Sequence, residues 1–383
     1  MTTTRRALIS GIAVGAALLA TACSPPSDSS TSSSPAAASG SAAVAGDAKS
    51  ATSAKDLGGL DALVAAAKKE GQLNVIALPP DWANYGEVIK GFTAKYAIKV
   101  NSAQPDGSSQ DEINAVKQLK GTGRAPDVLD IGMASALTNT TLFAPYQNEK
   151  WAEIADAQKE PTGLWVQDYG GYMSIGYDSA KVPAPTAVAD LLKPQYKGKV
   201  ALNGDPTQAN AALNGVMMAS VANGGSLDDI AKGVDFFKKL KGAGNFIPVQ
   251  ASTATIKNGT TQVVFDWDYL SAGASKNLPT WKVFVPNNAV IGGYYAQAIN
   301  KDAPHPAAAR LWQEYLYSDE GQNLWLKGGA RPVRMDAMTK AGTVDKAAAA
   351  ALPPVTGTPQ FMSPDQATKA KTFLAANWAK AIS

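Results

Sequence analysis

The sequence predicts an α/β protein built from two lobes. Its 383 residues are enough for two ordinary domains with proper cores. Beyond Lys55, helical and strand periodicities alternate as repeated β-loop-α units, a pattern typical of parallel strands covered by helices. A second series of such units begins after about Tyr172. No repeat of 20–50 residues is visible, which excludes solenoids and propellers.

The first series opens with an amphipathic helix. Leu57, Leu60, Leu63, Val64 and Ala67 share one helical face, and a glycine follows at position 71. A buried-type strand then runs over 72–78, and two prolines force a loop after it. The remaining expected elements of this lobe are a helix at 87–96, a strand at 98–102, a loop at 104–108, a helix at 111–120 and a strand at 128–131.

The second series has short apolar runs separated by helical stretches, again typical of α/β units. Its expected strands are 173–177, 200–203, 263–267 and 283–285. Its expected helices are about 209–222, 227–240 and 253–258.

Composition excludes several function classes. The formal net charge is only +3, so the basic stripe of a nucleic-acid binder is absent. One Cys and one His cannot form a clustered zinc site or an intrachain disulfide, and we expect no metal centre and no cofactor. Triad catalysis would rest on His305 alone, which opens an Ala-rich helical stretch and is better interpreted as a surface residue at a helix start.

The N-terminus has the pattern of an export signal. Arg5 and Arg6 precede an apolar run that is too short to span a bilayer stably. Small residues then lead to Cys23, which resembles the lipidation site of bacterial lipoproteins. Residues 1–22 are therefore expected to be a signal peptide, exported by the general or the twin-arginine route, and residues 23–55, rich in Ser, Ala and Pro, a disordered tether. This arrangement would anchor the protein through lipid at the outer, extracytoplasmic face of the cell membrane.

Five short motifs, in order along the chain, resemble a known family. They are APDVLD at 125–130, DLLKPQYKGKV at 190–200, APHPAA at 303–308, YSDEGQ at 317–322 and RPVR at 331–334. Together they resemble the extracellular solute-binding proteins of bacterial ABC importers, in the iron, polyamine and aminoalkylphosphonate branch.

The resemblance implies a type 2 periplasmic-binding-protein-like fold, with a ligand cleft between the lobes. Lobe 1 would comprise 56–168 and 290–383, and lobe 2 would comprise 169–289. It also implies a monomer without enzymatic activity that delivers a small molecule to an ABC transporter permease. Ligands of open α/β sheets lie beyond the carboxyl ends of the strands, which points to the same cleft.

In the first lobe, the loop after the opening strand holds a carboxylate between aromatic residues. Such a set suits a cation, through charge pairing and cation–π contacts; helix capping and packing are the alternative. Ser108 and Ser135 follow later strands and are either anion contacts or ordinary caps. The first-lobe candidates are Asp81, Trp82, Asn84, Tyr85, Ser108 and Ser135.

In the second lobe, strand alternation is expected to place Asp266 and Asp268 on one face, with Trp267 between them. Ferric-binding relatives have a Tyr-Tyr pair in this region, which this sequence lacks. Tyr294 and Tyr295 fall instead on a later strand, where polyamine binders have aromatic contacts, and we expect Tyr295 to face the ligand.

The loop at Asp205 and Thr207 corresponds to a place where relatives hold phosphate or phosphonate. The candidate loops are rich in acidic and aromatic residues and contain no Lys or Arg. We therefore expect a small cationic, polyamine-like amine as ligand, with an aminoalkylphosphonate or ferric ion as alternatives. A sensor domain or a secreted hydrolase is the alternative class, although carboxylates two residues apart on one strand are a poor glycosidase pair.

Overall fold

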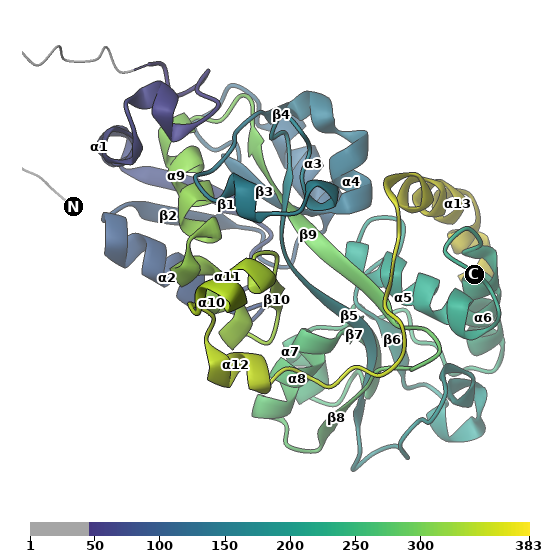
Figure 1. The fold of residues 1–383 in the computed structure, drawn as a ribbon. Helices are drawn as coiled ribbons and strands as arrows, with labels where there is room; N and C mark the ends of the chain where they lie inside the picture. The colour runs from purple at the N-terminus through teal and green to yellow at the C-terminus, as the bar shows by residue number, and fades with distance from the viewer. Residues whose placement is uncertain (1–45) are drawn as a thin grey trace, which may run out of the picture. The chain divides into compact units, whose positions relative to one another are not determined.

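The computed structural model describes residues 46–383, which form helices packed around two sheets (Figure 1). The expected signal peptide, Cys23 and most of the expected tether lie outside the described residues. Residues 46–55, which we expected to belong to the tether, are folded. Ala51 and Ala54 are buried, and the guanidinium of Arg310 donates to the carbonyl oxygens of Ala51 and Lys49. The folded part therefore begins before Lys55.

Two long strands connect the lobes. Strand β5 (Val166–Asp178) and strand β9 (Ile291–Asn300) pair antiparallel, with Val166 opposite Gln297 and Tyr172 opposite Gly292. The register shifts between Gln167 and Gly170, as it does at a β-bulge. Beyond this crossing, each strand continues into one lobe and pairs with that lobe's own strands (Figure 1).

The main sheet has the strand order β11-β9-β5-β7-β6, and β3 and β4 also pair with β9 while β8 and β10 pair with β5. A separate parallel pair is formed by β1 and β2. The bounds of these strands are β1 Gln72–Ile76, β2 Lys99–Ala103, β3 Val128–Gly132, β4 Phe143–Ala144, β6 Val200–Leu202, β7 Val263–Trp267, β8 Trp281–Phe284, β10 Arg331–Pro332 and β11 Gln360–Phe361.

The helices expected in the first lobe are present, but their first and last residues differ from the expected ones. Helix α3 begins at Ser109 because the Ser108 hydroxyl accepts a hydrogen bond from the backbone N–H of Asp111 and caps the helix. The first-lobe helices are α1 Leu60–Glu70, α2 Tyr85–Tyr96, α3 Ser109–Gln118, α4 Met133–Thr138, α9 Pro306–Tyr317, α10 Asp319–Lys327, α11 Met335–Ala341 and α12 Lys346–Ala350.

The second lobe contains helices α5 (Asn210–Ala222), α6 (Ala231–Gly242), α7 (Thr253–Lys257) and α8 (Asp268–Asn277). Helix α5 is buried on nearly all sides, and most of its residues are accordingly apolar or small. Helix α8 was not expected from the sequence. It follows β7 without a loop, so the strand ends one residue before Asp268.

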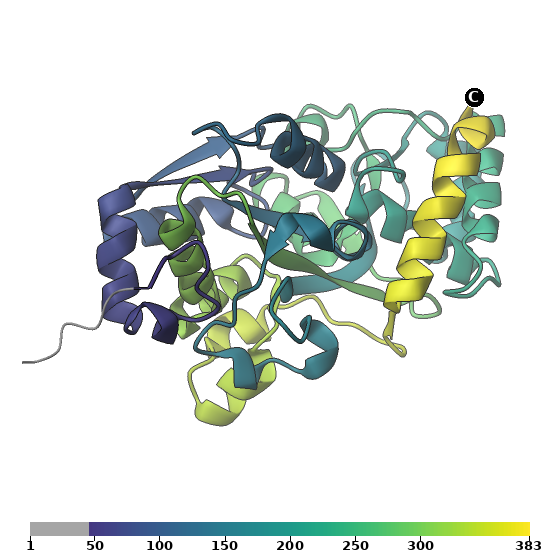
Figure 2. The same cartoon turned by 90° about the horizontal axis from the view of Figure 1, so that it is seen from above.

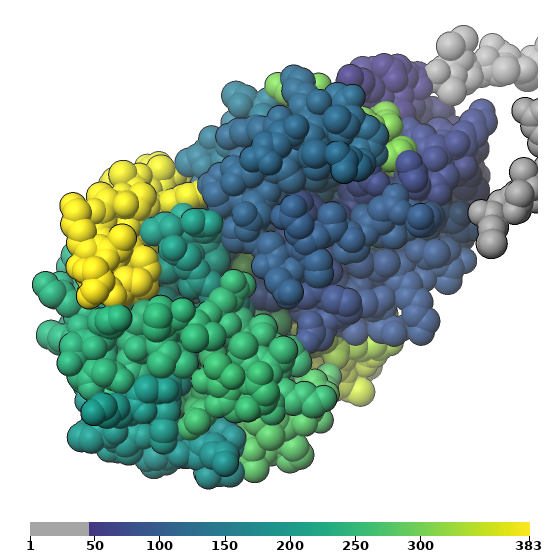
Figure 3. Space-filling model, turned by 180° about the vertical axis from the view of Figure 1, so that it is seen from behind, coloured from purple at the N-terminus to yellow at the C-terminus, as the bar shows by residue number. Residues whose placement is uncertain are grey.

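The C-terminal helix α13 (Pro364–Ile382) packs against helices of both lobes (Figure 2). On the second-lobe side, the ring of Trp378 contacts Phe237 and Phe246. Towards the first lobe, Nζ of Lys371 donates to the hydroxyl of Ser135 over 2.8 Å. The lobe boundaries stay a prediction, and residues 364–382 contact helices on both sides of the proposed boundary. Figure 3 shows the yellow C-terminal segment against the teal surface of the second lobe.

Candidate functional site

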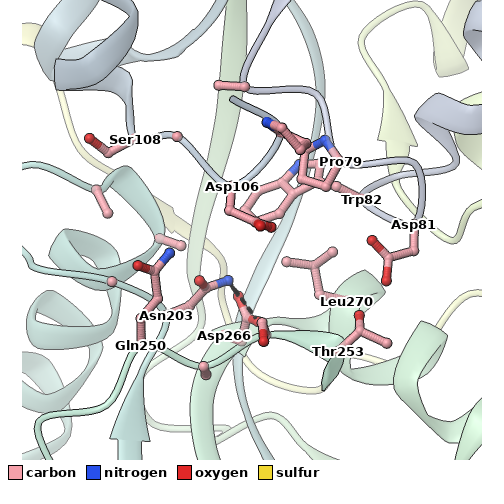
Figure 4. A pocket seen from close by; sticks show the side chains of 18 of the residues that line it. Pro79, Asp81, Trp82, Asp106, Ser108, Asn203, Gln250, Thr253, Asp266 and Leu270 are labelled. Atoms are coloured by element: carbon pink, nitrogen blue, oxygen red, sulfur yellow. Dashed lines mark hydrogen bonds between the residues drawn. The ribbon is translucent and has the colours of Figure 1, made fainter. Parts of the chain in front are cut away.

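A cavity of about 630 Å³ lies between loops of the two lobes. It opens beyond the carboxyl ends of β1, β2, β6 and β7, where ligands of α/β sheets bind. Figure 4 shows Asp106 and Trp82 on the first-lobe side, and Asp266 and Leu270 on the second-lobe side. The polar side chains that line it include Asp81, Asn84, Asp106, Ser108, Glu112, Asp130, Asn203, Asp205, Gln250, Ser252, Thr253, Asp266, Lys276 and Lys327.

Asp266 is a buried carboxylate on this cavity. It sits near the end of β7, and both of its oxygens accept hydrogen bonds from the Asn203 amide over 3.0 Å (Figure 4). It has no ion-pair partner within residues 46–383. Burial raises the pKa of Asp266 to about 7, only partly offset by the hydrogen bond from Asn203. The side chain is thus poised to ionise when a cation arrives.

Asp268 does not share this face, which corrects the expectation from strand alternation. Because α8 begins at Asp268, its side chain turns away from the cavity, and its carboxylate accepts from Nη1 of Arg331 over 2.7 Å. The backbone N–H groups of Tyr172 and Tyr269 also donate to it. Trp267 likewise does not line the cavity: its ring is fully buried and stacks on Tyr269.

The first-lobe loop places three of its four candidates on the cavity. Asp81, Trp82 and Asn84 line it, and Nδ2 of Asn84 also donates to the carbonyl of Leu324. Tyr85 does not line it, because its ring is fully buried at the start of α2. Trp82 meets Tyr295 edge to face at 5.6 Å between ring centroids, so the two aromatics form one corner of the cavity.

Tyr294 and Tyr295 point to opposite faces of β9. Tyr295 lines the cavity, whereas Tyr294 stacks on Phe361 of β11. Adjacent side chains on a strand must diverge in this way. Tyr294 is therefore placed away from the cavity, although the sequence made it a candidate.

The hydroxyl and loop candidates divide into two groups. Ser108 lines the cavity and caps α3, and Asp205 lines it while accepting from the backbone N–H and the hydroxyl of Thr207. Thr207 and Ser135 do not line the main cavity. They border a separate small hollow together with Lys371.

Beneath the first-lobe side lies a buried acid pair, Asp130 and Asp168. Asp130, in the middle of β3, lines the cavity, and its Oδ2 accepts from the hydroxyls of Tyr85 and Tyr169 over 2.8 and 2.7 Å. Burial raises the pKa of both carboxyls, and the proximity of Asp130 raises that of Asp168 further. The hydroxyls of Tyr85 and Tyr169 thus both donate to one oxygen of a carboxyl that has a second buried carboxyl as its neighbour.

Several lining residues were missed from the sequence. Asp106 lies on a loop that was noted for its serine, while Gln250 and Thr253 lie in a segment without an obvious motif. Lys276 on α8 and Lys327 on α10 also reach the cavity, so it has cationic side chains that the candidate loops do not contain. Proximity in sequence to the strand ends would have identified Asp106 and Asn203; nothing in the sequence identifies the two lysines.

His305 is buried, not on the surface as expected, although it does sit at the start of α9. Its Nδ1 and the Asp127 carboxylate are 2.9 Å apart, and this hydrogen bond raises the pKa of the imidazole. Among the residues that the structure describes, no three His, Cys, Asp or Glu side chains come together as a metal site. Over the same residues, no helix has both the length and the apolar character of a membrane span.

Similar solved structures share this fold. Iron-bound HitA from Pseudomonas aeruginosa is 19% identical, with 81% of this chain and 99% of that chain covered and a TM-score of 0.61. AfuA from Actinobacillus pleuropneumoniae, with fructose-6-phosphate bound, is 17% identical, with coverage of 82% and 98% and a TM-score of 0.65. AgtB from A. tumefaciens R10, in complex with agropinic acid, is 18% identical, with coverage of 82% and 98% and a TM-score of 0.64.

These likenesses confirm the two-lobed, periplasmic-binding-protein-like α/β fold. The matched proteins are binding proteins of extracytoplasmic type. The family match covers residues 126–357, more than half of the sequence, and its description is bacterial extracellular solute-binding protein. The chain belongs to this family, whose members are the substrate-binding components of ABC-type importers.

Proposed function

We propose that the protein captures a small cationic amine of polyamine type between its lobes and delivers it to an ABC permease. The observation that supports this most is Asp266, a carboxylate buried on the cavity without a cationic partner among residues 46–383. A buried carboxylate is costly unless it is protonated or paired. An ammonium group in the cavity would supply the missing partner.

The remaining lining supports the same ligand. Acidic side chains outnumber cationic ones, with Asp81, Asp106, Asp111, Glu112, Asp130, Asp205 and Asp266 against Lys276 and Lys327. Trp82 and Tyr295 provide aromatic surface beside these carboxylates, and a cation near an aromatic face gains about 0.5–2 kcal/mol. Charge pairing and cation–π contact would therefore act on the same group.

A second candidate is an aminoalkylphosphonate. Its ammonium would contact Asp266, and its anionic end would lie near Lys276 or Lys327, with hydroxyls of Ser108, Ser252 and Thr253 as further donors. The two lysines are the observation that favours it. Because each is exposed and the acidic groups are more numerous, we rank it below a simple amine.

Neither a hydrolase nor a ferric-binding role gains support from the cavity. The carboxylate pair that the sequence offered to a hydrolase is not formed, because Asp266 faces the cavity while Asp268 is paired with Arg331. His305 is hydrogen-bonded to Asp127 and does not line the cavity. Ferric-binding relatives use a Tyr-Tyr pair, whereas of Tyr294 and Tyr295 only Tyr295 lines this cavity. A binding role, not an enzymatic one, is what we propose.

We further propose that Cys23 is lipidated and holds the protein at the extracytoplasmic face of the membrane. Replacing Cys23 with Ala should release the folded protein from the membrane fraction, while export continues. Retention of a processed Cys23→Ala protein at the membrane would contradict the lipoprotein assignment.

The ligand is tested by a thermal-shift screen of the purified protein. The panel contains putrescine, spermidine, choline, thiamine, aminoethylphosphonate, fructose-6-phosphate and ferric citrate. A ligand that binds only the folded state stabilises it by about 2.7 kcal/mol at a hundredfold excess over Kd. We expect the amines to raise Tm most; a larger shift with an anion or ferric citrate, and none with any amine, would overturn the proposal.

A further inference from the structure

The side chain of Trp82 is connected to the acid pair by one tyrosine hydroxyl. Nε1 of Trp82 donates to the hydroxyl of Tyr169 over 2.8 Å, and that hydroxyl donates to Oδ2 of Asp130 over 2.7 Å. A hydroxyl has a single proton. Because Asp130 accepts that proton, the oxygen of Tyr169 is left as an acceptor for the indole N–H.

Asp130 fixes the donor-to-acceptor direction of the hydrogen bonds that run from Trp82 through Tyr169. Oδ1 of Asp130 has no N–H or hydroxyl donor among the described residues, and Asp168 is the neighbouring carboxyl with which it interacts. A carboxylate oxygen can only accept, so the hydroxyls of Tyr85 and Tyr169 must both donate to Oδ2 of Asp130, and this fixes the direction in which the Tyr169 hydroxyl points.

The backbone departs from regular geometry on both sides of the Trp82–Tyr169 hydrogen bond. Tyr169 lies where β5 shifts register against β9, and bulges of this kind redirect side chains next to binding sites. On the other side, Ala83 has φ 45° and Asn84 has φ 68°, both in the left-handed region directly after Trp82. Such strain persists only where surrounding contacts hold it.

We propose that Tyr169 and Asp130 are positioning residues, which fix the Trp82 indole against the cavity so that its face is presented to the ligand. This inference rests on the proposed function in one respect, because it assumes that Trp82 contacts the ligand. Tyr169 itself is fully buried and does not line the cavity. It acts through Trp82.

Tyr85 offers a matched control. It is equally buried, and its hydroxyl donates to the same oxygen of Asp130, but it makes no hydrogen bond to Trp82. Tyr169→Phe and Tyr85→Phe therefore each remove one donor to Asp130, and only the first removes the acceptor of the indole. Trp82→Phe removes the indole N–H while keeping an aromatic ring.

The first measurement needs no ligand. The indole N–H resonance of Trp82, assigned by its loss in Trp82→Phe, should shift and exchange faster with solvent in Tyr169→Phe and stay in place in Tyr85→Phe. Equal changes in both variants, or none in Tyr169→Phe, would overturn the positioning role, whatever the ligand proves to be.

The second measurement titrates spermidine into five proteins, which are the unmodified protein, the three single variants and the Trp82→Phe/Tyr169→Phe double variant. Tyr169→Phe should weaken binding about threefold to tenfold, as expected for one hydrogen bond, and Tyr85→Phe should change it less. In the Trp82→Phe background, Tyr169→Phe should have no further effect. If Tyr169→Phe weakens binding in the Trp82→Phe background as much as it does in the unmodified protein, Tyr169 acts independently of Trp82 and the proposal is contradicted. If the unmodified protein does not bind spermidine at all, only the proposed ligand is contradicted.

Discussion

Asp266 and Asp268 are two residues apart, and both are buried, yet their surroundings differ. Asp268 has an Arg331 guanidinium at 2.7 Å and two backbone N–H donors, and its carboxylate does not line the cavity. Asp266 accepts from the Asn203 amide and from the backbone N–H of Trp267, has no cationic partner among the described residues, and borders the cavity. The comparison teaches that burial alone does not mark a binding residue. A buried charge whose partner is within the chain serves the fold, and one whose partner is lacking among the described residues points to a ligand.

The largest loss of stability is expected when the ion pair between Asp268 and Arg331 is broken. Arg331→Met leaves Asp268 buried without its cation, and breaking a buried ion pair in this way costs about 3–5 kcal/mol. Denaturant unfolding should show a loss of this size at neutral pH. Adding Asp268→Asn should recover part of it, because the charge left behind is then removed. A loss below about 1 kcal/mol would contradict the structural role.

Asp266→Asn, in contrast, should increase the free energy of unfolding of the ligand-free protein above pH 7. The folded-state pKa of Asp266 is raised to about 7, above its ordinary value of 3.8. Between these values the folded state binds more protons than the unfolded state, so stability falls as pH rises from about 4 to 7. Above pH 7 the variant, which lacks the ionisable group, should be more stable by about 2–4 kcal/mol.

Unfolding curves at pH 4.5 and pH 8 test this expectation. The stability difference between Asp266→Asn and the unmodified protein should be small at the lower pH and grow at the higher one. Equal differences at both values would show that Asp266 does not titrate in this window. Asp268→Asn serves as the control, and it should destabilise the protein at pH 8.

The aromatic corner should contribute less. Trp82→Leu keeps an apolar side chain and removes the aromatic face, so a bound amine should lose about 0.5–2 kcal/mol, or about twofold to thirtyfold in affinity. Spermidine titration measures the loss. Tyr294→Leu is the matched control on the opposite face of β9, and it should leave affinity unchanged. An equal loss in both variants would mean that the register of β9 is wrong.

The smallest effect is expected at the exposed rim. Asp205 is exposed, and its carboxylate already accepts from Thr207. Exposed charge pairs contribute about 0.2–1 kcal/mol. Asp205→Asn should therefore weaken spermidine binding no more than about fivefold, and the loss should shrink in high salt. A loss as large as that of Asp266→Asn would reverse the proposed order of importance.

Much of the fold was predictable because it follows from periodicity. The β-loop-α order, the crossing strand at Tyr295 and the loop at Asp81 and Trp82 depend on local patterns. The end of β7 could not be predicted from a local pattern, since an apolar run followed by Asp266 and Asp268 is also compatible with a longer strand. One residue of difference changed Asp268 from a ligand candidate into a partner of Arg331.

The rest of the site was unpredictable for a different reason. Tyr169, Asp130 and Asp168 form one network only because β5, β3 and α2 meet in space. Lys276 and Lys327 reach the cavity from helices in which no sequence pattern indicated a site. Such convergence depends on tertiary geometry, and no spacing along the chain indicates it.

The central claim is that a ligand cation replaces a proton on Asp266. Isothermal calorimetry with spermidine, in buffers of different ionisation enthalpy, counts the protons released on binding. With a pKa of about 7 for Asp266, binding should release about 0.9 proton at pH 6 and about 0.1 at pH 8, with affinity rising by about tenfold between them. In Asp266→Asn the release should disappear. Binding that releases no proton at pH 6 and has the same affinity at both pH values would contradict the account.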